Sequence, residues 1–140
     1  MTSKLTESDI ENLAIGILLK MGYTWKWGPD IAPDGQHSER REWDEVLLHQ
    51  RLEDAVKRIN PKVSDEARTD AIKQLSRINN PVLLTNNERF HKMLTEGIKV
   101  TDRKDGEQRG ELVWLIDFKN SEKNDFLVVN QFTVIENHNI

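Results

Sequence analysis

Hydrophobic positions repeat with helical spacing through most of the first two thirds of the chain. In Thr6–Met21 the apolar residues at positions 10, 13, 14, 17, 18 and 21 share one face of a helix. Further apolar residues at positions 15 and 19 widen that face. We therefore expect this helix to be central and covered on more than one side. The candidate capping boxes at its start are Thr6 with Asp9 and Ser8 with Glu11.

The same spacing predicts further helices, and an alternating pattern predicts one early strand. The predicted helices are Trp43–Ile59, a helix capped by Ser64, and Asn86–Glu96. Aromatic residues alternate with polar ones in Tyr23–Trp27, which predicts a short strand. The glycines and prolines of Gly28–Gly35 predict a loop after that strand.

Beyond Gly97 the hydrophobic period changes from helical to strand-like. The predicted strands are Ile98–Asp102, Glu111–Phe118 and Phe126–Ile135, with a hairpin turn at Asp105-Gly106. Both faces of Leu112–Ile116 and of Phe126–Ile135 are mostly apolar, so we expect helices on both sides of the sheet. The predicted fold class is α/β (α+β), with helices followed by an antiparallel meander. The last strand should require a further partner strand at its edge.

Composition restricts the functional classes. The chain is 36% hydrophobic and 31% charged, and no apolar run reaches the length of a membrane helix. It has no cysteine and no signal-peptide pattern at its start, which together favour the cytoplasm. The net charge of −4 argues against a broad DNA-binding surface, because duplex binding depends on basic side chains. Any DNA contact should come from a local patch or from another part of a longer protein.

Glu11 is the carboxylate that the pattern singles out, because it borders the apolar face of the first helix. The simpler interpretation is an acid of the first turn, favoured by capping and by the helix dipole. The functional interpretation is an accessory catalytic acid that belongs to the outer ligands of a Mg²⁺ site. Asn130 and Gln131 are more simply amides that pin the strand register than contacts to DNA or a partner.

Other candidate residues have simpler explanations. The histidines at 37, 49, 91 and 138 lack metal-ligand spacing, and a phosphate-binding Gly-rich loop with lysine is absent from the sequence. The basic pair Arg40-Arg41 has acids close by, so a solvated loop is favoured over phosphate contact. Trp25 and Trp27 could stack on bases, although packing is the commoner role.

Three stretches together resemble the N-terminal region of the R (restriction and motor) subunit of type I restriction–modification enzymes. They are ESDIENLAIGILLKMGY at Glu7–Tyr23 with GPDIAPDG at Gly28–Gly35, NNPVLLTNNERFHKMLTEGIKV at Asn79–Val100, and LIDFKNSEKNDFLVVNQFTVIE at Leu115–Glu136. The last stretch is the most specific, since any capped amphipathic helix is similar to the first.

The resemblance implies a partial restriction-endonuclease-like domain of the PD-(D/E)xK type. It implies that residues 1–140 are the N-terminal part of that domain, ending before the catalytic Asp and the Glu-x-Lys, and that this piece alone is inactive. The full-length subunit would cleave double-stranded DNA with Mg²⁺ after ATP-driven translocation, together with methylation and specificity subunits. No cofactor is expected in the piece itself. Among the acids implied by the family, the helical glutamate matches Glu11.

One alternative belongs to a different class. The chain could be a free-standing protein-interaction module that pairs with a partner, or with a second copy, through the edge of its last strand.

Overall fold

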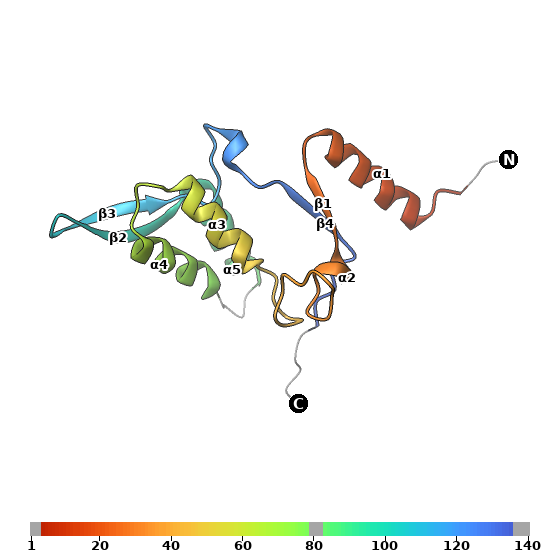
Figure 1. Ribbon diagram of the computed structural model, residues 1–140, viewed down its shortest axis with the longest axis horizontal. Helices are drawn as coiled ribbons and strands as arrows, with labels where there is room; N and C mark the ends of the chain where they lie inside the picture. Colours follow the sequence, from red (N-terminus) through yellow and green to blue (C-terminus); the bar gives the residue numbers. More distant parts are fainter. Residues whose placement is uncertain (1–3, 79–82, 136–140) are drawn as a thin grey trace, which may run out of the picture. The chain divides into compact units, whose positions relative to one another are not determined.

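The computed structural model describes residues 4–78 and 83–135. The chain divides into two compact units, and Figure 1 shows the elements of each. Unit 1 comprises Met1–His49 and Asp125–Ile140, and unit 2 comprises Gln50–Asn124. No helix in the described residues is both long enough and apolar enough to cross a membrane.

Unit 1 is built around two parallel strands from opposite ends of the sequence. Its elements are α1 (Glu7–Lys20), β1 (Thr24–Trp27), α2 (Gly28–Ile31) and β4 (Leu127–Asn130). The strand register runs from Thr24 opposite Leu127 to Trp27 opposite Asn130. Tyr23 and Phe126, just before the strands, place their rings 5.3 Å apart. Both strands therefore end at the same edge of unit 1.

Helix α1 begins at the first of the two expected capping boxes. The Thr6 hydroxyl accepts from the Asp9 N–H at 3.1 Å, and the Asp9 carboxylate accepts from the Thr6 N–H at 3.0 Å. Both bonds lower the pKa of Asp9, and the bond from the Thr6 backbone has the larger effect. Glu11 takes no part in the cap. After the helix, Gly22 adopts φ +98°, which a glycine tolerates best.

The expectation that the first helix is central and covered on several sides is wrong. None of the α1 residues is buried, and Ile10, Leu13 and Ile17 are each more than half exposed. The physical reason is the size of the sheet, because two four-residue strands can cover only part of a wide apolar face.

The buried core of unit 1 lies in α2 and the segment that follows it, and it includes a charged side chain. Arg40 is 2% exposed, and it donates from Nε to the Glu45 carbonyl at 3.0 Å and from Nη2 to the Trp43 carbonyl at 2.8 Å. Its guanidinium also lies 4.1 Å from the centre of the Phe132 ring. The expectation of a solvated basic pair is therefore wrong for Arg40, while Arg41 is exposed.

Unit 2 packs helices against a β-hairpin. Its elements are α3 (His49–Ile59), α4 (Asp65–Ser76), α5 (Leu83–Glu96), β2 (Ile98–Lys104), β3 (Glu107–Val113) and the short 3₁₀ helix η1 (Ser121–Lys123). The hairpin turn at Asp105-Gly106 has positive φ at both residues and confirms the predicted Asp-Gly turn. Ser64 caps α4 as predicted, accepting from the Ala67 N–H at 3.1 Å.

The core of unit 2 forms where α4 meets β2. Burial alternates along β2, as expected for a strand with one covered face. The fully or nearly buried apolar residues of this unit are Val56, Ala67, Ala71, Leu75, Ile98, Val100 and Val113. Asp102, on the same strand, is 1% exposed and accepts from the Ser64 N–H at 3.1 Å. Hydrogen bonding from the Ser64 side chain, and then from its backbone, lowers the pKa of Asp102.

The predicted antiparallel meander is wrong beyond its first hairpin. Strand β3 ends at Val113, because the backbone of Trp114 bonds to the Asn60 side chain instead of to a strand. The Trp114 N–H donates to Asn60 Oδ1 at 2.8 Å, and the Trp114 carbonyl accepts from Asn60 Nδ2 at 2.8 Å. The final strand is limited to β4 and pairs in parallel with β1, and Phe126 remains 41% exposed. Other boundaries also differ, since α3 starts at His49 and α5 at Leu83. The expected loop at Gly28 begins with the short helix α2.

Candidate functional site

Glu11 lies one turn inside α1 and is half-buried. Because Asp9 closes the capping box, the cap does not account for the Glu11 carboxylate. Its partner is Gln131, whose Nε2 lies 3.1 Å from each of the two carboxylate oxygens. A half-buried acid is thus oriented by a side chain that is 120 residues away in the sequence.

Gln131 follows directly after the last residue of β4, at the carboxyl end of the parallel pair. Its φ is +56°, a left-handed conformation that is uncommon for residues other than glycine. The residue after β1 is Gly28, and a Cβ placed there would lie only 2.2 Å from the Gln131 carbonyl oxygen. The close approach of these two backbones requires glycine at position 28. Binding sites of parallel sheets commonly lie at this edge, outside the carboxyl ends of the strands.

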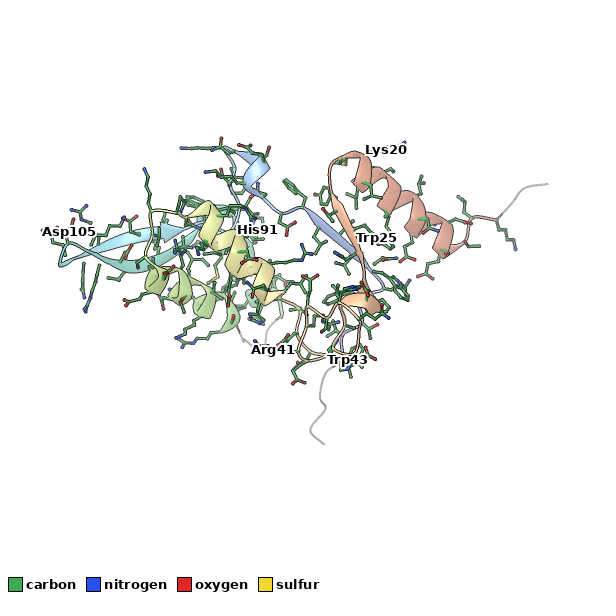
Figure 2. All side chains as sticks on the ribbon, viewed as in Figure 1. Lys20, Trp25, Arg41, Trp43, His91 and Asp105 are labelled. Carbon is green, nitrogen blue, oxygen red and sulfur yellow. The ribbon has the colours of Figure 1, made fainter. Side chains whose placement is uncertain are left out.

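A second amide fixes the strands that lead to this edge. Asn130 Oδ1 accepts from the Trp25 indole Nε1–H at 2.8 Å, which ties the side chain of one strand to that of the other. This cross-strand bond supports the interpretation of Asn130 as a register pin, whereas Gln131 lies beyond β4 and bonds to Glu11 instead. Figure 2 shows Trp25 on β1 and Trp43 in the segment that follows α2. Trp25 remains 43% exposed even though its indole nitrogen is paired.

The arrangement offers one oriented carboxylate. A carboxylate accepts through about four lone-pair positions, so the single amide of Gln131 leaves some of them unused. Such a group can serve as one oxygen ligand of a hard cation or can accept a proton from water. Within residues 4–78 and 83–135, however, His, Cys, Asp and Glu side chains form no group of at least three that could hold a metal ion. The described residues therefore do not by themselves fit a complete Mg²⁺ site.

Among the remaining candidates, Trp27 also lies at this edge, as the last residue of β1, and is half exposed. His37 Nδ1 lies 3.0 Å from an Asp30 carboxylate oxygen and is largely exposed. His138 lies outside the described residues. The pairing of Gln131 with Glu11 was missed by sequence reasoning, and no local spacing could have indicated it.

Comparison with known proteins adds the decisive observation. A family model described as "Type I restriction enzyme R protein N terminus" matches residues 4–140. The chain belongs to this family. Its resemblance to the N-terminal region of R subunits, noted from three stretches, is thereby confirmed over almost the whole sequence.

Two relatives of this chain are named as endonuclease subunits of type I restriction enzymes. One, from Methanocaldococcus jannaschii, has the provisional name type I restriction enzyme MjaIXP endonuclease subunit and is 37% identical over 133 residues. The other, the type I restriction enzyme HindI endonuclease subunit of Haemophilus influenzae, is 30% identical over 130 residues. These matches cover 94% and 93% of this chain but only 13% and 12% of the relatives. No solved structure matches the chain.

Proposed function

We propose that this chain is the N-terminal region of an R subunit whose full-length form cleaves double-stranded DNA. In this proposal the full-length subunit uses Mg²⁺ and ATP, translocates DNA before cleavage, and works with methylation and specificity subunits in the cytoplasm. The observation that carries the proposal is the family match over residues 4–140, together with relatives named as endonuclease subunits.

The two units would be part of a nuclease domain of the PD-(D/E)xK type. The mixed helix and strand content and the parallel pair β1–β4 are compatible with a larger sheet that carries more strands. Since the relatives are roughly eight times longer than the matched region, further strands and acids would come from other parts of the full-length polypeptide. The main catalytic Asp and the Glu-x-Lys are proposed to lie there.

Glu11 is proposed as the accessory acid that this region contributes. Its support is positional, because the carboxylate is half-buried, is not used for capping, and meets Gln131 at the carboxyl end of a parallel pair. At that edge a carboxylate could help to bind Mg²⁺ through water or could orient a water molecule near the phosphodiester.

The test is Glu11→Gln in the full-length R subunit, assembled with its methylation and specificity subunits. We expect DNA cleavage in Mg²⁺ to fall about tenfold or more, the usual effect of removing an outer partner of a metal site. The thermal unfolding midpoint should be unchanged. The matched control is Glu7→Gln, which removes the same charge from an exposed position one turn earlier on α1. Cleavage that is equal in both variants would refute the role of Glu11.

The piece alone is proposed to be inactive, and this has its own test. The purified 140-residue chain would be incubated with duplex DNA and Mg²⁺, with and without ATP. We expect no strand breaks above background. Cleavage that disappears in a Glu11→Gln chain would show that the piece carries a complete active site and would refute this part.

A protein-interaction module remains the second candidate function. Exposed apolar side chains along α1, including Leu13 and Ile17, favour it, because an apolar face of this kind commonly contacts another protein surface. Sedimentation of the 140-residue chain would test it. A stable dimer that is disrupted by Leu13→Glu would favour the module over the nuclease region.

A further inference from the structure

Gln131 combines a left-handed backbone with a side-chain hydrogen bond to a distant residue. Its backbone is left-handed, with φ +56°, although glutamine has no intrinsic preference for that region. Its side chain nevertheless makes a long-range contact, with Nε2 at 3.1 Å from each oxygen of Glu11. Backbone strain at a non-glycine residue persists only where the surroundings enforce it, and such positions cluster at functional sites.

The surroundings that enforce this conformation come from the other parallel strand. Gly28 follows β1, and the Asn130 and Gln131 carbonyl oxygens lie 2.6 and 2.2 Å from the position a Cβ would take there. Asn130, the residue before the turn, is held by the Trp25 indole at 2.8 Å. The chain therefore leaves β4 along a path that β1 and the residue after it constrain, and the Gln131 side chain on this path reaches Glu11 on α1.

The contact also selects which part of the carboxylate stays available. One nitrogen equidistant from both oxygens takes the position between them, where a bidentate partner would otherwise bind. The lone pairs on the outer sides of the two oxygens remain for water or another donor. Glu11 is consequently oriented and restricted to single-oxygen contacts as long as Gln131 is in place.

We propose that Gln131 is the positioning residue of Glu11, setting the direction of its carboxylate from the left-handed end of β4. This inference rests on the accessory-acid role proposed for Glu11. Gln131 itself touches no substrate in this proposal and acts through the carboxylate alone.

The experiment uses the full-length R subunit in its assembled enzyme and compares four single variants and the double variant of Glu11→Ala with Gln131→Met. Gln131→Met keeps the length of the side chain but cannot donate a hydrogen bond. Gln131→Gly also removes the amide but accepts the left-handed backbone without strain. Glu11→Ala removes the carboxylate, and Gln108→Met makes the matched change at an exposed position on β3.

The expected results separate positioning from folding. Both Gln131 variants should lower the rate of DNA cleavage about tenfold, as for other residues that orient a functional carboxylate, and Gln108→Met should not. In a Glu11→Ala background, Gln131→Met should cause no further loss. Hydrogen exchange followed by mass spectrometry should show α1 exchanging faster in Gln131→Met and to the same extent in Glu11→Ala.

Several results would overturn the inference, and they point to different failures. If Glu11→Ala cleaves normally, the accessory-acid role fails and the positioning role fails with it. If Glu11→Ala is impaired while Gln131→Met and Gln131→Gly are not, only the positioning role fails. A further loss from Gln131→Met in the Glu11→Ala background would mean that Gln131 acts on something other than Glu11.

Discussion

Gly28→Ala is the substitution whose effect the structure determines most directly. A methyl group at position 28 would lie 2.2 Å from the Gln131 carbonyl oxygen and 2.6 Å from that of Asn130. Cβ atoms essentially never approach other heavy atoms closer than 3.0 Å, so the nearer carbonyl must retreat by at least about 0.8 Å, the difference between 3.0 and 2.2 Å. Both obstacles are backbone atoms, which no change of rotamer can move.

The loss of stability in Gly28→Ala depends on how far the two backbone carbonyls must be displaced. Overpacking a well-packed site costs about 1–3 kcal/mol, and displacement of two carbonyls at the end of a parallel pair should place this change near 3 kcal/mol. The matched control is Gly16→Ala in the middle of α1, where an added Cβ would meet nothing within 4 Å. That substitution should stabilise unit 1 by about 0.5–1 kcal/mol, because alanine is the better helix former.

Tryptophan fluorescence during urea unfolding provides the assay. Trp25, Trp27 and Trp43 belong to unit 1, and Trp114 belongs to unit 2. A Trp114→Phe background therefore confines the signal to unit 1. With a urea slope of about 1 kcal/mol/M for a small unit, a cost near 3 kcal/mol should lower the midpoint by about 3 M.

The result that would refute the reasoning is specific. If Gly28→Ala unfolds at the same urea concentration as the parent while Gly16→Ala shows its small gain, the close approach of the two backbones does not exist in solution. The left-handed path at Gln131 would then lose its structural explanation.

Three further predictions concern polar side chains in the cores. Asn60→Ala should destabilise unit 2 by about 2–3 kcal/mol, since the Trp114 N–H and carbonyl lose their partner. The unfolding midpoint of unit 2 would be measured by Trp114 fluorescence. Arg40→Lys should destabilise unit 1 by about 1–3 kcal/mol, because lysine cannot reproduce the two carbonyl bonds and the ring contact. Asp102→Asn should remove a part of the acid dependence of unfolding. The pKa of Asp102 is lowered below its ordinary 3.8, so its stabilisation is present above that value and is lost as pH falls below about 4.

The Asn60 and Arg40 predictions have matched controls on the surface, and an equal midpoint for Arg40→Lys and Arg41→Lys would contradict the buried role of Arg40. Asn87→Ala and Arg41→Lys make the same changes at exposed positions and should leave the unfolding midpoints unchanged. Equal stability of Asn60→Ala and Asn87→Ala would argue against the bridging role of that amide. For Asp102, midpoints would be measured between about pH 3 and pH 6, and an unchanged pH dependence in the variant would contradict the linkage.

The sequence alone determined the features that depend on residues close together along the chain. The Thr6 and Asp9 capping box, the Ser64 cap and the Asp105-Gly106 turn were all predicted and confirmed. Their bonds and dihedral angles involve residues within a few positions of each other, so residue type and spacing suffice. The family was also accessible from the sequence, because three stretches in order carry it across almost the whole chain.

Tertiary structure decided everything that depends on distant partners. Spacing could not show whether the final strand joins the hairpin or pairs with β1. Nor could it show whether Arg40 is solvated or buried, or whether Glu11 caps its helix or contacts Gln131. The physical reason is that local patterns state which faces must be covered but not which segment covers them. The candidate site is the clearest case, since its carboxylate was predicted and its amide partner, 120 residues away, was supplied by the fold.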